Sequence, residues 1–198
     1  MLKLPLLELF LRGLPEEFLL IFARIRGYKV GPLFKAWAIY PVFIFALIYV
    51  VLEVMIFRGN YSFIKYADKF HFIYTLMFLI LIIKYRLNAS AIIGSVFIFG
   101  GSILNNIVIS ANNGKMPVFP TISYWTGYAR PEVFTKVKDI HILGSSLTKL
   151  KFLTDIFDIG YSIMSIGDIF IRVFAFIIIF NTIKVINNSN IHNVNVST

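Results

Sequence analysis

The chain contains no cysteine, which excludes disulfide bonds, thiolate catalysis and metal sites built on cysteine. Charged residues make up only 15% of the chain, and acids are scarcer than bases, with 10 Asp and Glu against 19 Lys and Arg. Only 3 His are present, and neither His71 nor His141 has a spacing typical of metal ligands. We therefore expect no metal centre and no other cofactor.

Apolar residues dominate the composition, since 58% of the chain is hydrophobic and 21 residues are Phe. The mean hydropathy of +0.80 indicates more apolar surface than one soluble core of this size can bury. The net charge of +9 lies mostly between the apolar runs, where basic side chains contact lipid head groups. Nucleic acid is not an expected partner, because no basic helix face accompanies this charge. The composition predicts a membrane protein in contact with membrane lipids.

Four apolar runs are long enough to cross a hydrocarbon core of ~30 Å as helices. They cover residues 37–57, 63–84, 89–109 and 165–186. The second span requires Lys65 to extend toward the head groups. The predicted fold class is therefore all-α, a polytopic membrane protein with four transmembrane helices in a single membrane domain, residues 1–186.

The amino-terminal part predicts a short helix, because Pro15 and two acids precede an apolar run that ends at Arg24 and Gly27. A helix of that length rises only ~18 Å, so we expect it to lie in the membrane interface. Glu8 interrupts the apolar stretch near the start, and we expect no removable leader.

The long loop between the third and fourth spans, residues 110–164, is rich in aromatic residues and predicts an ordered cap on the membrane surface. The Asn-rich tail, residues 187–198, lacks apolar periodicity and is predicted to be disordered. Basic residues concentrate at 24–35, which favours a multi-pass protein of the cell membrane with both termini in the cytoplasm.

Asp168 is the first candidate for a functional and even catalytic residue, since an acid within a membrane helix costs several kcal/mol unless it is paired or hydrated. The end of the third span and the start of the fourth should meet at one membrane face. Amides, a lysine and acids gathered there would bind a polar head group or transfer a proton. The candidate ligand-binding residues are Asn105, Asn106, Asn112, Asn113, Lys115, Asp155, Asp158, Asp168 and Arg172.

Each part of this site also has a purely structural explanation. Ser165 and Asp168 match a capping box, and Asp168 and Arg172 are spaced as a helical ion pair. The Asn-Asn-Gly sequence at 112–114 is a turn signal. The glycines at 100–101 favour close helix packing.

Short elements in the second half of the chain resemble a bacterial multi-pass membrane family known as domain of unknown function 5317. They are NNGKMPV at 112–118, FLTDI at 152–156 and SIGDI at 165–169, with His141 and Leu143 between them. The resemblance implies a bacterial membrane protein and supplies no reaction. It is carried by several short elements in the same order.

Two of the same regions, residues 100–106 and 165–168, look like the catalytic blocks of lipoprotein signal peptidase, a membrane aspartyl enzyme. The first acid of that family is missing, because Val108, Ile109 and Ser110 stand where it would lie. Two carboxylates must share a proton in that mechanism, so Asp168 alone does not supply it.

Three functions remain open from the sequence. The favoured one is a non-enzymatic membrane protein that binds a lipid-like or small ligand, or a partner membrane protein, at a polar cleft near one membrane face. The alternatives are a membrane-embedded aspartyl hydrolase that uses Asp168 and a substrate-capturing transporter subunit. No inverted repeat, which transporters often contain, is visible.

Overall fold

The computed structural model describes residues 16–136 and 139–196, so the leader interpretation based on Glu8 lies outside the described residues. The chain forms two compact units, which are described separately. The first comprises Met1–Tyr49, His71–Ser95 and Phe174–Thr198, and the second comprises Val50–Phe70 and Val96–Val173.

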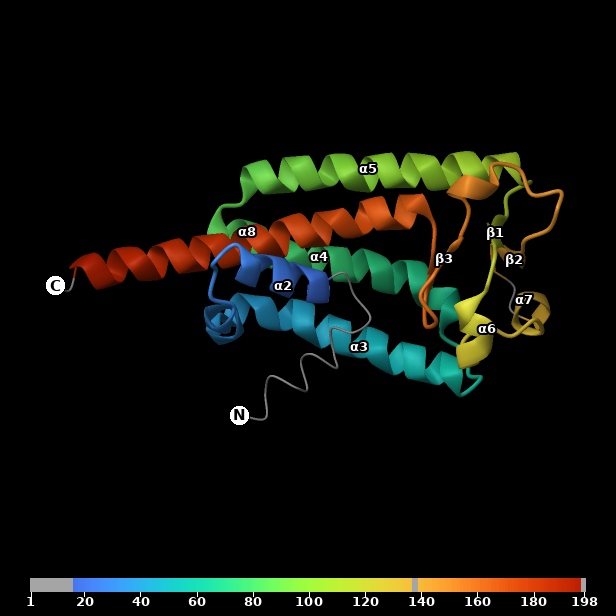
Figure 1. Ribbon diagram of the computed structural model, residues 1–198, viewed down its shortest axis with the longest axis horizontal. Helices are drawn as coiled ribbons and strands as arrows, with labels where there is room; N and C mark the ends of the chain where they lie inside the picture. The colour runs from blue at the N-terminus through green and yellow to red at the C-terminus, as the bar shows by residue number, and fades with distance from the viewer. Residues whose placement is uncertain (1–15, 137–138, 197–198) are drawn as a thin grey trace. The chain divides into compact units, whose positions relative to one another are not determined.

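Long helices dominate the structure (Figure 1). They are α3 Tyr40–Phe57, α4 Ala67–Tyr85, α5 Asn88–Ala111 and α8 Ile166–Val196. Within the described ranges, three helical segments are long and apolar enough to cross a membrane: Trp37–Phe57, Asn88–Ala111 and Ile166–Ser189. The chain is thus mostly helical, with three candidate spans.

The predicted span at 63–84 corresponds to α4, preceded by the 3-10 turn η3 Ile64–Tyr66. Asp68 and Lys69 occupy the first turn of α4, and Lys84 lies in its last turn. These charges shorten the apolar part of the helix, and α4 is not among the three candidate spans. A fourth crossing therefore stays a prediction.

In the first unit, the predicted short amino-terminal helix is present as α2, Glu16–Ile25. Leu19 and Ala23, one helical turn apart, are fully buried. The ring of Phe22 lies 5.9 Å from that of Phe176 and 5.4 Å from that of Phe180 on α8, measured between centroids. The 3-10 turns η1 Gly31–Lys35 and η2 Trp37–Ile39 lead from α2 into α3. The location of α2 in a membrane interface stays a prediction.

The carboxyl-terminal tail differs from the expected disorder, because α8 continues as far as Val196. Extending an existing helix costs far less than nucleating one. Asn187 also fixes this part of α8, since its Nδ2 donates to the Lys29 carbonyl at 2.9 Å and its Oδ1 accepts from the Lys29 N–H at 2.8 Å. This pairing across the chain was not visible in the sequence.

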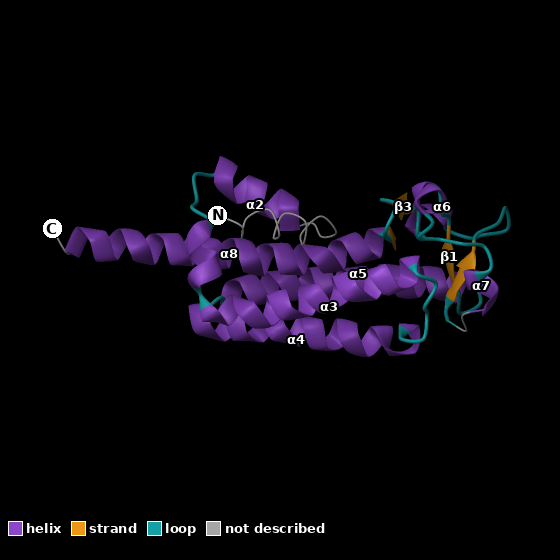
Figure 2. Ribbon diagram, turned by 90° about the horizontal axis from the view of Figure 1, so that it is seen from below, coloured by secondary structure: helices purple, strands orange, loops and turns teal. Residues whose placement is uncertain are grey.

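In the second unit, the segment between α5 and α8 is a folded cap in its described residues (Figure 2). The parallel strands are β1 Met116–Val118 and β2 His141–Leu143, with Met116 opposite His141. The antiparallel strands are β3 Phe157–Asp158 and β4 Ile163–Met164. Short helices complete the cap: α6 Ile122–Thr126, α7 Val133–Lys136 and η4 Lys151–Leu153. The predicted loop at 110–164 is therefore ordered in these residues.

Candidate functional site

In the second unit, the start of α8 packs closely against the second half of α5. A Cβ added at Gly101 would collide with the Gly167 carbonyl, and a Cβ at Gly167 would collide with Asn105 and the Gly101 carbonyl. Gly100 has more room, with the nearest atom, on Phe170, 3.8 Å from an added Cβ. Gly101 therefore serves close helix packing, as one interpretation of the sequence predicted.

Asp168 belongs to a closed set of hydrogen bonds at the start of α8. Its N–H donates to the Ser165 Oγ at 2.9 Å, and its Oδ2 accepts from the Ser165 N–H at 2.9 Å. Asn105 on α5 donates from Nδ2 to the Asp168 Oδ1 at 2.9 Å and accepts from the Ser165 Oγ at 2.8 Å. The predicted capping box is thus confirmed and extended by Asn105, which joins the two helices.

The predicted ion pair between Asp168 and Arg172 is wrong. Both oxygens of Asp168 already accept hydrogen bonds, from Asn105 and Ser165. The Arg172 Nη2 instead donates to the Ser162 Oγ at 3.4 Å. The spacing of four residues suits an ion pair on a helix. The carboxylate of Asp168 is held instead by Ser165 at the start of α8 and by Asn105 on α5.

A second polar cluster lies in the cap and joins Asp139, His141 and Asp155. The His141 Nδ1 lies 2.8 and 2.7 Å from the two oxygens of Asp139, and its Nε2 lies 3.7 Å from the Asp155 Oδ2. Strand β1 positions both sides of this cluster. It pairs with His141 on β2, and its Pro117 carbonyl accepts from the Asp155 N–H at 3.2 Å.

Asp155 is the most unusual member of this acid–histidine cluster. It is only 3% exposed, and its Oδ1 has no hydrogen-bond partner among the described residues. Burial, together with the charge of Asp168, raises the pKa of the Asp155 carboxyl to about 7, although His141 opposes this change. Asp155 and Asp168 are therefore close enough to influence one another. A buried acid that ionises near neutral pH is typical of functional sites.

The other two members, Asp139 and His141, are joined by hydrogen bonds that shift the pKa of each. Burial favours neutral His141, but the hydrogen bond and charge of Asp139, with help from Asp155, raise the pKa of the imidazole. Burial also works against ionised Asp139, yet the hydrogen bonds and charge of His141, together with the Ile140 N–H, outweigh burial and lower the pKa of that carboxyl. The cluster thus combines a carboxyl whose pKa is lowered, an imidazole whose pKa is raised and a second acid whose pKa is raised to about 7.

Four predicted ligand-binding residues at or just after the end of α5 lie outside the acid–histidine cluster or have structural roles. Asn106 is exposed, and Asn113 adopts the left-handed conformation of a turn, with φ 57°. The Asn112 side chain bonds to the Val108 and Lys149 carbonyls and accepts from the Lys149 N–H, which ties the cap to α5. The Lys115 Nζ donates to the Asp139 carbonyl at 3.0 Å.

Asp158 is a structural residue of the cap. Its carboxylate accepts hydrogen bonds from the backbone N–H groups of Thr121, Ser123 and Gly160 and from the Ser123 hydroxyl. Burial opposes ionisation, but these hydrogen bonds, led by those of Ser123, lower the pKa of the carboxyl. Asp158 therefore holds the start of α6 and has no free oxygen for a ligand.

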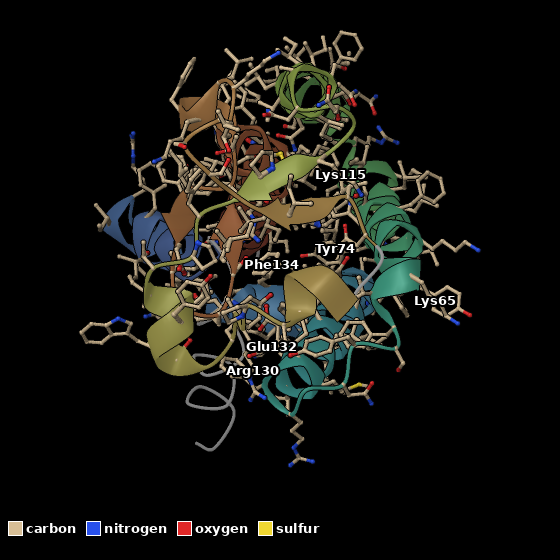
Figure 3. The ribbon with its side chains drawn as sticks, turned by 90° about the vertical axis from the view of Figure 1, so that its right-hand side faces the viewer. Lys65, Tyr74, Lys115, Arg130, Glu132 and Phe134 are labelled. Carbon is tan, nitrogen blue, oxygen red and sulfur yellow. The ribbon has the colours of Figure 1, made fainter. Side chains whose placement is uncertain are left out.

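The sequence interpretation omitted Asp139 and treated His141 as an ordinary interfacial residue. The short Asp139-Ile140-His141 sequence was the available signal, because an acid two residues from a histidine can hold its ring. In the described ranges, no three His, Asp or Glu side chains are arranged to hold a metal ion. Figure 3 labels Lys115 beside β1, Arg130 and Glu132 just before α7, and Phe134 within α7.

The structure defines a class: a mainly helical protein with helices apolar enough for a membrane and a cap in which a buried acid, Asp155, lies beside His141. The chain belongs to the Family of unknown function (DUF5317), whose model matches residues 31–180. No curated protein and no solved structure matches the chain. The likeness to lipoprotein signal peptidase is therefore unsupported.

Proposed function

We propose that this chain is an integral, multi-pass membrane protein that binds a small or lipid-like ligand at the acid–histidine cluster. The ligand would carry a hydroxyl or protonated amine that donates to Asp155. One observation carries the proposal, namely that the buried Asp155 Oδ1 has no partner in the described part of the chain. A buried polar atom without a hydrogen bond costs ~1–3 kcal/mol, which a bound donor would recover.

The charge of the cluster supports a ligand of this chemistry. Asp139 and Asp168 add negative charge around Asp155, and His141 is the basic group that faces Asp155 among the interactions described. Such a site favours a proton or a cationic donor over an anion. The side chain of His141 is 43% exposed, so the cluster can be reached from its surface.

A membrane hydrolase is the second candidate, favoured by the influence of Asp168 on Asp155. In an aspartyl mechanism the two carboxylates share one proton and activate water. Asp168 suits this role less well, because Asn105 and Ser165 occupy both of its oxygens.

Native mass spectrometry of the detergent-purified protein tests the proposal. We expect a bound small molecule or lipid on the wild type and on Glu132→Gln, a matched change of an exposed cap acid. The Asp155→Asn variant should lose this species while remaining folded. Equal retention in all three proteins, or no bound species on the wild type between pH 5 and 8, would overturn the proposal. If uncleaved membrane peptides accumulated in cells that express the Asp155→Asn variant and also in cells that express the Asp168→Asn variant, the result would favour the hydrolase.

A further inference from the structure

The cap contains an open, mostly apolar groove of about 1020 Å³, here called the cap groove. Its lining includes Phe119, Tyr124, Leu143, Leu150 and Phe152, and all of these residues belong to the second unit. Phe152 is 61% exposed, so a large aromatic surface of the groove is open. An apolar surface of this kind on a folded segment marks an interaction site.

Large apolar side chains elsewhere on the cap are also uncovered. Trp125 on α6 is 95% exposed and Leu147 is 88% exposed. Trp and Tyr are enriched where protein meets lipid head groups, because one part of the ring is apolar and another is polar. These side chains therefore favour a lipid over a soluble partner as the occupant of the groove.

Positive charge accompanies the cap groove. The Lys151 Nζ lies 4.4 Å from the centroid of the Phe119 ring, and Lys149 is exposed two residues earlier. No ion pair with a described residue neutralises either lysine. One acid of this region, Asp158, uses its oxygens on the backbone around α6. The two lysines are thus available for an anionic group.

The chain itself holds the cap at the membrane. The cap connects the end of one candidate span, at Ala111, with the start of another, at Ile166. Contact between Gly101 and Gly167 places the start of α8 beside the second half of α5. A folded segment tied at both ends to membrane helices lies at the lipid surface.

We infer that the cap groove binds an acyl chain of an anionic phospholipid, with Lys149 and Lys151 contacting its phosphate. The charge of the two lysines supplies the preference for an anionic head group. The apolar lining supplies the contact with the chain. This inference uses different residues from the acid–histidine cluster, so either proposal can fail alone.

Site-directed fluorescence quenching tests the inference, helped by the absence of native cysteine. Phe152→Cys, in the groove, and Glu132→Cys, on the cap outside its lining, would each carry a bimane label in phosphatidylcholine nanodiscs. Brominated phosphatidylglycerol or brominated phosphatidylcholine is then added in increasing fraction. We expect quenching at position 152 and little at 132, with half-maximal quenching at an about 30-fold lower fraction of the anionic lipid.

Replacing both lysines, in Lys149→Gln with Lys151→Gln, should remove the preference while leaving quenching by brominated phosphatidylcholine in place. A label at Leu147→Cys repeats the measurement without altering the groove lining. Equal quenching by the two lipids in the protein with both lysines would overturn the anionic assignment. No quenching at 152 and 147 would overturn lipid occupancy. Crosslinking between the 152 positions of two copies, with loss of quenching, would assign the groove to a second copy instead.

Discussion

Replacement of Asp155 by Asn tests directly whether the acid–histidine cluster stores an unfavourable charge. The folded structure raises the pKa of this carboxyl from its ordinary value of 3.8 to about 7. A change of this size costs roughly 4 kcal/mol of folding free energy once the group is ionised. Asn removes the charge but also the attraction to His141, so we expect a net gain of about 2 kcal/mol at pH 8.

The pH dependence of folding stability follows from the direction in which the pKa of Asp155 is shifted. Between pH 4 and 7 the folded protein binds the Asp155 proton more tightly than the unfolded chain does, so stability falls as the pH rises through this window. His141 acts in the same direction, because its raised pKa gives stability that is present below its ordinary 6.5 and lost above the folded value. In the Asp155→Asn variant, only the part of the pH dependence of stability that is due to His141 should remain.

Thermal unfolding in detergent, followed by intrinsic fluorescence at pH 5 to 8, measures both effects. For a chain of this length, a gain of about 2 kcal/mol raises the Tm by about 4–8 °C at pH 8. The variant should also show a flatter dependence of Tm on pH than the wild type, whereas Glu132→Gln should follow the wild type. An Asp155→Asn protein with the wild-type slope, or with a lower Tm at pH 8, would refute the reasoning.

Five further substitutions, grouped in three tests, probe other contacts of the second unit. Gly101→Ala should lower the Tm strongly because its Cβ meets α8, whereas Gly100→Ala should leave it unchanged or raise it through better helix propensity; equal effects would contradict the packing. Asp168→Asn and Ser165→Ala should each cost about 1 kcal/mol in denaturant unfolding through loss of the cap, and an unchanged midpoint would argue against it. Asn112→Ala removes three hydrogen bonds, two of which join Asn112 to the backbone of Lys149. Amide hydrogen exchange around Lys149 should therefore become faster. Unchanged protection of these amides would show that the Asn112 side chain does not hold this part of the cap.

Much of the site was not predictable because its contacts are distant in sequence. Asn105 and Asp168 were both candidates, but the hydrogen bond that joins them spans 63 positions and depends on the glycine contact between α5 and α8. Asp155 was a candidate without a partner. Its pairing with His141 requires β1 to contact both segments at once, and no local periodicity reports such an arrangement.

The sequence by itself determined the local features of this protein. Uninterrupted apolar runs specify long helices, the spacing of Ser165 and Asp168 specifies a capping box, and the residues at 112–114 specify a turn, because each depends on neighbours within a few positions. The tertiary structure alone decided that Asp155 is buried beside His141 and that Lys29 holds Asn187 in an extended α8. Those outcomes arise from desolvation and pairing between segments that meet only when the chain folds.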